Sequence, residues 1–408
     1  MKNVPELRFK EFSGEWKEEK FGQLFSFVST NSFSREKLNY NAGKVKNIHY
    51  GDIHTKFRSL FNIRKENVPF INEEILDKKI NDGTFCKEGD LIIADASEDY
   101  EAIGKTIELI NLNREKIIAG LHTIMARPIN NNMAIGFAGY LVQYKNVRYQ
   151  IKMIAQGIKV LSISVKRLKE IYLNIPSLPE QQKIASFLSA IDKKIELTDK
   201  RLEYLEFYKK GLMQKLLTGK VRFPGFNDEW KEEKLGNLLT EHNEKNINNY
   251  LPIAVGVNGI RQRNEIFSKV ISNNVSNNKV IKKDNLIIGL GTKKIVFGVL
   301  REDKKYSVSP AYIVYNINTK KINSYFLQEK LNYINGLLSC KYLIISARQG
   351  KTINKIDFLK YNILISSIPE QQKIASFLSA IDKNIELTKS RLENLRTYKK
   401  GLLQKMFV

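Results

Sequence analysis

The fold is decided by a stretch that occurs twice: residues 179–193 read PEQQKIASFLSAIDK, and residues 369–383 repeat these letters without change. The similarity continues to Leu217 and Phe407, with 30 identities in 39 aligned positions. A proline followed by a glutamate at the start of each copy is typical of a helix N-terminus. Because an internal repeat determines the architecture of a chain, we expect two tandem units.

Apolar residues follow one another at alternating spacings of four and three through both copies. They are Ile184, Leu188, Ile191, Ile195, Leu202, Leu205, Leu212 and Leu216, and then Ile374, Leu378, Ile381, Ile385, Leu392, Leu395, Leu402 and Met406. Thr198 and Lys209 interrupt the first ladder, and Thr388 and Lys399 interrupt the second. This spacing over about five heptads predicts two long helices with a coiled-coil seam. A generic dimerisation helix would show the same pattern, but one chain here supplies both strands of a coil.

A second repeat frames the first, because Trp16 and Trp230 are each followed by the sequence KEEK. The two repeats predict four segments: a first domain at 1–178 with a flank at 1–20, a helix at 179–218, a second domain at 219–368 with a flank at 219–234, and a helix at 369–408. Each segment leads directly into the next, so the simplest pairing of the helices is antiparallel and pseudo-two-fold symmetric. Short apolar runs between Gly, Asn and Asp turns predict α+β domains.

The net charge of +24 lies mainly in the two domains. Residues 235–368 carry 20 basic and 8 acidic side chains, a net charge of +12, and residues 21–178 carry 22 and 16, a net charge of +6. A positive field of this size favours a polyanionic partner, although a merely solvated surface would also be basic. Two cysteines exclude a disulfide framework, and no apolar run could form a signal peptide or cross a bilayer. We therefore expect a soluble, cytoplasmic protein.

Two different domains that alternate with two near-identical helices resemble the specificity subunit of a type I restriction-modification system. The resemblance covers essentially the whole chain and is carried by IPSLPEQQKIA at 175–185 and by its second copy, which has Ile365-Ser366 in place of Ile175-Pro176. It implies two target-recognition domains, each of which binds one half of a bipartite, asymmetric site on double-stranded DNA. The coiled coil would set the spacer between the halves, about one DNA turn or roughly 34 Å.

The same resemblance implies the partners and their chemistry. Two methyltransferase subunits would dock on the coiled coil, and two motor-nuclease subunits would complete the restricting complex. S-adenosylmethionine, ATP and Mg²⁺ are then expected in those partners, with no cofactor in this chain. The chain itself would be non-catalytic.

The candidate DNA contacts combine basic, amide, histidine and aromatic side chains, which bind phosphates and base edges. In the first domain they are Lys44, Lys46, Asn47, His49, Tyr50, His54, Lys56 and Arg58, with Ser97 in a polar turn and Lys159 after a Gln-Gly pair. In the second domain they are Asn258, Arg261, Arg263, Asn264, Thr292, Lys293, Lys294, Arg348, Gln349 and Lys351. Structural histidines, a metal-binding histidine pair, ordinary turns and solvated lysines are the alternatives.

Apolar residues outside the seam predict a second surface on the helices. They are Phe187, Leu197 and Tyr208, repeated as Phe377, Leu387 and Tyr398. We expect these residues to bind the methyltransferase subunits; packing against the chain's own domains is the alternative.

The sequence offers no convincing catalytic or metal site. Gly350-Lys351-Thr352 resembles the end of a phosphate-binding loop, but Ile345 stands where that motif needs a glycine. A free-standing bipartite DNA-binding regulator and a non-catalytic coiled-coil scaffold remain the alternative functions.

Overall fold

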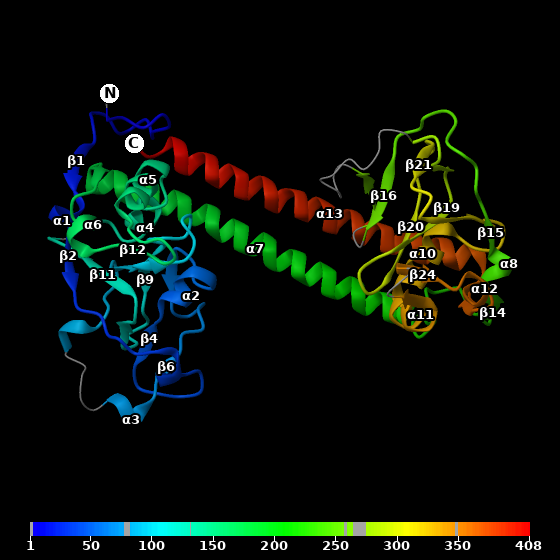
Figure 1. Cartoon of the computed structure of the whole chain (residues 1–408), viewed down its shortest axis with the longest axis horizontal. Coiled ribbons are helices and arrows are strands. Elements are labelled where there is room, and N and C mark those ends of the chain that lie inside the picture. The colour runs from blue at the N-terminus through cyan, green and yellow to red at the C-terminus, as the bar shows by residue number, and fades with distance from the viewer. Residues whose placement is uncertain (1–2, 77–81, 131, 257–258, 264–274, 347–349) are drawn as a thin grey trace. The chain divides into compact units, whose positions relative to one another are not determined.

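The computed structural model describes residues 3–76, 82–130, 132–256, 259–263, 275–346 and 350–408. The chain forms two compact units, one made of Met1–Asp199 with Ser390–Val408 and the other of Lys200–Lys389. The two long helices are α7 (Leu178–Leu216) and α13 (Ile368–Lys405), and each unit contains a part of both (Figure 1).

The first unit is built around a five-stranded sheet. Its strand order is β2 (Phe25–Val28), β11 (Thr123–Pro128), β7 (Leu91–Ala94), β9 (Thr106–Asn111) and β5 (Leu60–Asn62). All four residues of β7 are buried, as expected for a central strand with the sequence LIIA. A four-stranded sheet has the order β10 (Ile117–Ala119), β4 (Lys46–Ile48), β6 (Phe70–Ile71) and β3 (Leu38–Asn39).

Short strand pairs and short helices complete this unit. The strand pairs are β1 (Lys17–Lys20) with β13 (Tyr172–Ile175) and β8 (Ala96–Ser97) with β12 (Leu161–Ser162). The α-helices are α1 (Phe21–Leu24), α2 (Tyr50–Thr55), α3 (Glu73–Leu76), α4 (Phe137–Leu141), α5 (Lys145–Ile154) and α6 (Val165–Leu168). Residues Arg35–Lys37 and Asp82–Thr84 form 3₁₀ turns.

The second unit has a different, fully antiparallel sheet of four strands, β15 (Leu239–Glu241), β22 (Ile313–Ile317), β19 (Asn285–Leu290) and β20 (Ile295–Val299). The strand pairs are β14 (Lys231–Lys234) with β25 (Asn362–Ile365), β16 (Ile253–Gly256) with β17 (Gly259–Gln262), β18 (Lys279–Ile281) with β21 (Tyr306–Val308), and β23 (Leu343–Ser346) with β24 (Gly350–Ile353). Its helices include α8 (Leu235–Leu238), α10 (Ser324–Tyr333), α11 (Asn335–Tyr342) and α12 (Lys355–Leu359). The predicted α+β class is confirmed.

The repeated sequence makes the same contacts in both units. The Arg8 guanidinium forms two 2.8 Å hydrogen bonds with the buried carboxylate of Glu180. Arg222 and Glu370 repeat this pair at 2.8 and 2.7 Å. The KEEK sequences pair as edge strands in the same register, β1 with β13 and β14 with β25. In each unit the N-terminal flank is therefore held against the start of a long helix by the same contacts.

The first glutamine of each copy, Gln181 or Gln371, fastens the domain to the helix. The buried amide of Gln181 accepts a hydrogen bond from the Ala134 N–H at 2.9 Å and donates to the Pro176 carbonyl at 3.0 Å. Gln371 makes the equivalent bonds to Asn323 at 2.8 Å and to Ser366 at 2.7 Å. We call the Arg–Glu pair and these glutamine contacts the helix joint. The helix joint gives a structural role to the Glu-Gln pair that follows the proline at the start of each copy of the repeat.

The two long helices are antiparallel in both units. In the first unit Leu402 and Met406, near the end of α13, share a core with Ile184 and Leu188, near the start of α7. In the second unit the end of α7 shares a core with the start of α13 in the same way. The Phe407 ring lies 6.2 Å from the Trp16 ring, so the C-terminal segment packs on the N-terminal flank.

The polar interruptions of the seam all have partners. The hydroxyls of Thr198 and Thr388 donate to carbonyls one helical turn earlier, each at 2.7 Å. Lys399 forms a 2.6 Å ion pair with Asp192, which also accepts a 2.7 Å hydrogen bond from Tyr140. The second unit repeats this arrangement with Lys209, Asp382 and Tyr325, and adds Glu329 as another partner of Lys209 at 2.9 Å. Charge neutralisation thus allows a lysine within the seam.

Candidate nucleic-acid interface

The β19–β20 hairpin of the second unit presents two lysines at its tip. The strands pair as far as Leu290 and Ile295, and the Gly291 N–H closes the turn with a 2.9 Å bond to the Lys294 carbonyl. Thr292, Lys293 and Lys294 are exposed. Within the described part of the chain neither lysine has an acidic partner, so both ammonium groups are free to neutralise phosphates.

A second hairpin brings another lysine to the same place. The Lys351 ammonium, on β24, donates to the Gly291 carbonyl at 3.0 Å. This contact joins the β23–β24 hairpin to the lysine-bearing turn, although about 60 residues separate them along the chain. Arg348 and Gln349 lie outside the described residues.

The β16–β17 hairpin carries the candidate base-reading arginines. Arg261 is exposed opposite Ala254, and Arg263 is half-buried. The hairpin packs on β20, where a side chain at Gly298 would approach Val255 and Ile260 within 2.9 Å. Arg261 thus lies on a hairpin that packs directly against the hairpin bearing Lys293 and Lys294. Asn258 and Asn264 lie outside the described residues.

The predicted DNA contacts of the first unit, which are Lys44 to Arg58 with Ser97 and Lys159, divide into buried structural residues and accessible residues. Asn47 is fully buried, and its side-chain amide nitrogen donates to the side-chain Oδ1 of Asn31 at 3.0 Å. The prediction that Asn47 contacts DNA is therefore wrong for this structure, because no face of the side chain is open. Ser97 is also buried, with its hydroxyl bonded to the Asp99 carbonyl at 2.9 Å. It holds a turn and leaves no surface for a base.

Several basic residues of that segment have acidic partners. Lys46 pairs with Glu115 and lies over the Phe70 ring at 5.0 Å. Lys56 forms a 2.9 Å ion pair with Asp52. Arg58 forms one with Glu196 of α7 at 2.9 Å, which gives it a role in holding the domain to the helix. In contrast, Lys44 and Lys159 are exposed and lack an acidic partner among the described residues.

A cluster of aromatic rings surrounds Tyr50, and we call His49, Tyr50, His54 and His122 the histidine–tyrosine cluster. The Tyr50 ring lies 4.7, 6.1 and 5.3 Å from the rings of His49, His54 and His122. The sequence analysis missed His122, because it follows Tyr50 by about 70 residues and only the sheet brings the two together. His122 has a positive φ of 54° in a Gly-Leu-His turn, a backbone conformation that is uncommon for residues other than glycine.

Hydrogen bonds fix the orientation of this cluster. The His49 imidazole accepts from the Gly51 N–H at 3.1 Å and caps α2, and burial with the nearby Arg35 lowers its pKa. His54 Nε2 bonds to the Ala96 carbonyl at 3.0 Å. His122 lies 3.3 Å from Asp95, whose pKa is raised by burial. No three described His, Cys, Asp or Glu side chains are arranged to hold a metal ion.

The apolar residues on the outer faces of the helices divide into two groups. Phe187 and Phe377 each pack edge-on against a phenylalanine of the flank, Phe9 and Phe223, with centroids 5.6 Å apart. Phe187 and Phe377 therefore pack against the chain's own flanks, which is the alternative to binding a methyltransferase subunit. Leu197 and its repeat Leu387 are both 59% exposed, and Tyr208 and Tyr398 are also exposed.

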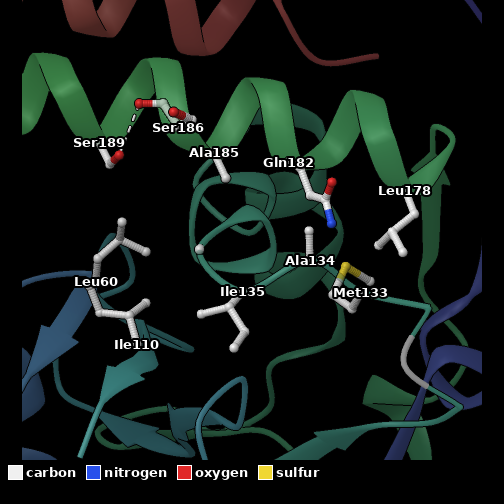
Figure 2. Close-up of a pocket in the computed structure, with 11 residues that line it drawn as sticks. Leu60, Ile110, Met133, Ala134, Ile135, Leu178, Gln182, Ala185, Ser186 and Ser189 are labelled. Atoms are coloured by element: carbon white, nitrogen blue, oxygen red, sulfur yellow. Dashed lines mark hydrogen bonds between the residues drawn. The ribbon is translucent and has the colours of Figure 1, made fainter.

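A groove of about 620 Å³ runs beside the first turns of α7 in the first unit. Figure 2 shows Ile135 and Ala134 on one side of it, with Ala185 and Gln182 of α7 opposite. The buried Glu108 carboxyl accepts from the N–H of Gly136, which lines the groove, at 2.5 Å and from the N–H of Gly139 at 2.6 Å. Burial raises the pKa of Glu108 to about 7. This carboxyl holds the start of α4 against the sheet.

None of the described helices combines the length and the apolar character that crossing a bilayer requires.

Comparison with known proteins matches residues 13–206 and 227–397 to a family model described as the type I restriction modification DNA specificity domain. The putative type I restriction enzyme MjaX specificity subunit of Methanocaldococcus jannaschii is 27% identical over 331 residues, which are 77% of this chain and 76% of that protein. The MjaVIII specificity subunit of the same organism is 25% identical over 283 residues, 62% of this chain and 65% of that protein.

Solved structures show the same fold. The S subunit of a type I restriction-modification system from M. genitalium aligns with a TM-score of 0.64 at 16% identity, over 99% of both chains. A chain from a structural study of complex assembly and conformational transition of the type I R-M system aligns with a TM-score of 0.52 at 14% identity, over 95% of this chain and 96% of that one. With the family model covering both units, the chain belongs to the type I restriction-modification DNA specificity family and serves as a DNA sequence-specificity subunit.

Proposed function

We propose that each unit binds one half of a bipartite, asymmetric DNA site. The observation that carries this proposal is the helix joint, in which Gln181 and Gln371 fasten domains with different sheets to near-identical helices. Arg8–Glu180 and Arg222–Glu370 fasten the flanks in the same way. Equivalent attachments with different sheets supply two readers of different specificity. The two halves of the site are therefore expected to be unrelated in sequence.

In the second unit, Lys293, Lys294 and Lys351 are the proposed phosphate contacts. They gather at two adjoining hairpin tips, and their positive charges position the unit on the DNA backbone. Arg261, exposed on the next hairpin, is the proposed base contact, because a guanidinium can bond to O6 and N7 of a guanine together.

In the first unit, Lys44 and Lys159 are the proposed phosphate contacts. Tyr50, His54 and His122 of the histidine–tyrosine cluster are the proposed base contacts. The His54 ring is oriented by its hydrogen bond to the Ala96 carbonyl, and His122 approaches Asp95 at 3.3 Å with about half of its side chain exposed. Fixed rings lose little entropy on binding, which favours sequence selection.

The helices are the proposed spacer and docking platform. Leu197, Tyr208, Leu387 and Tyr398 expose apolar surface that the seam does not use, and the positions repeat between the helices. Two methyltransferase subunits bound there would receive equivalent contacts. S-adenosylmethionine, ATP and Mg²⁺ would be bound by the methyltransferase and motor-nuclease partners.

Selection from a random DNA library with this chain and its modification subunit tests the proposal. The expected product is a motif of two unequal halves separated by a fixed number of unselected base pairs. A single uninterrupted motif, or two halves of identical sequence, would contradict the assignment of one half to each unit.

A further inference from the structure

The two long helices are nearly identical, and their few differences are unevenly distributed. Residues 179–217 and 369–407 differ at 9 of 39 aligned positions. Two of these differences reverse the sign of a charge: Asp199 corresponds to Lys389, and Glu206 corresponds to Arg396. The other seven exchange neutral residues or replace a lysine by a neutral one. The first helix is thus acidic at both positions and the second is basic at both.

Both positions lie in ion pairs between the helices. In the first unit Asp199 Oδ1 lies 3.5 Å from Arg396 Nη2. In the second unit Glu206 Oε1 lies 2.6 Å from Lys389 Nζ. In each ion pair, a residue at position 199 of one repeat faces the residue equivalent to position 206 in the other repeat. The two sign reversals occur at sites that face each other.

This arrangement distinguishes the native pairing from a pairing of like helices. If the first helices of two molecules paired in the same register, Asp199 of each would face Glu206 of the other. If the second helices paired, Lys389 would face Arg396. Each like pairing would replace two attractive contacts by two repulsive ones.

The two bridges Asp192–Lys399 and Lys209–Asp382 do not make this distinction. Asp192 and Lys209 are both present in the first helix, and Asp382 and Lys399 are both present in the second. The Asp192–Lys399 bridge would therefore re-form between two like helices. The apolar ladder is also almost unchanged between the copies, with Met406 in place of Leu216 as its one difference.

We infer that Asp199, Glu206, Lys389 and Arg396 select the partner of each long helix, which pairs with the other repeat and rejects the same repeat of a second copy of this chain. Without such selection, near-identical helices would join separate molecules, and specificity against a similar partner needs a repulsive element. The four side chains are 46–54% exposed, so each of the two contacts is weak, but both contacts change sign together in a like pairing.

A charge exchange at constant net charge tests this selection. The variant Asp199→Lys/Arg396→Glu keeps both native ion pairs attractive and makes each helix complementary to itself. The variant Asp199→Lys/Glu206→Arg/Lys389→Asp/Arg396→Glu also keeps both native pairs but leaves like helices repulsive. It is the matched control, with twice as many substitutions. Each full-length protein would be refolded from denaturant at high concentration, and its oligomers separated and weighed by light scattering.

We expect the two-site variant to form roughly ten times more dimer and higher oligomer than wild type, and the four-site variant to match wild type. The difference should disappear in about 1 M salt, where screening is nearly complete. Equal oligomer fractions in all three proteins at low salt, or oligomers in the four-site control, would overturn the inference. Glu206→Lys/Lys389→Glu makes the same exchange at the other pair and decides the question if the first variant does not fold.

Discussion

At the scale of single residues, buried polar side chains join parts of the chain that lie far apart in the sequence, as in Asn47 with Asn31 and Arg8 with Glu180. The ladder from Ile184 onward was visible because it depends on local periodicity. The burial of Asn47 depends on Asn31, and the position of His122 depends on a sheet that pairs distant strands. The helix joint was also missed, because its partners Arg8 and Glu180 are about 170 residues apart.

Glu108 should make the stability of the first unit depend on pH. Its pKa rises from 4.5 to about 7, so the folded state binds more protons than the unfolded state between these values. Stability relative to Glu108→Gln should then be highest below pH 4.5 and fall by about 3 kcal/mol as pH rises through 7. Denaturation followed by Trp16 fluorescence in a Trp230→Phe background would measure this trend. The exposed Glu203→Gln is the control, and a constant difference across pH would contradict the expectation.

The helix joint should be more sensitive in the second unit than in the first. The Glu370 carboxylate accepts from Arg222 and also from the Trp230 indole at 3.2 Å, whereas the Trp16 indole has no hydrogen-bond partner among the described residues. Glu370→Gln should therefore cost about 3 kcal/mol of unfolding free energy, and Glu180→Gln about 2 kcal/mol. Urea denaturation of the two variants measures both values. Equal or reversed costs would show that the indole bond adds nothing.

At the scale of elements, the long helices and the flank strands were predictable because the sequence of each occurs twice in the chain. Their antiparallel pairing followed from connectivity and is confirmed in each unit. The sheets were not predictable in order: β11 lies between β2 and β7, and β22 lies between β15 and β19. Strand order depends on long-range packing that short apolar runs do not encode.

The lysine-bearing hairpin should neutralise DNA phosphates. Lys293→Ala/Lys294→Ala should weaken DNA binding and reduce the slope of log affinity against log salt by about 1 for each phosphate that the variant no longer neutralises. Titration of labelled DNA at several salt concentrations measures this slope. Lys360→Ala, also in the second unit but paired with Asp357 at 3.0 Å, is the matched control. A salt slope unchanged in the double variant would remove this turn from the interface.

The exposed helix faces should be needed for the modification subunit. Leu197→Arg and Leu387→Arg place a charge on equivalent, open positions, so each should reduce co-purification of that subunit without lowering the melting temperature. Met153→Arg, 61% exposed on α5, provides a control at a similarly open apolar site. If both helix variants retain the full amount of modification subunit, the docking face lies elsewhere.

At the scale of the whole molecule, two units repeat one plan with different contents. Both contain the helix joint, the flank strand and a lysine–aspartate–tyrosine group at the seam. Their sheets and their net charges, +6 at 21–178 and +12 at 235–368, differ. The chain therefore combines a constant platform with two independent surfaces, as a subunit that supplies sequence specificity requires.

The most direct test of this account is to map modified bases across the genome in cells with the native chain, without it, and with residues 239–353 replaced by the equivalent part of another specificity subunit. Loss of the chain should abolish one discontinuous methylated motif. The replacement should change one half of that motif and leave the other half intact. An unchanged motif without the chain, or a replacement that alters both halves, would contradict the claim that each unit reads its own half-site.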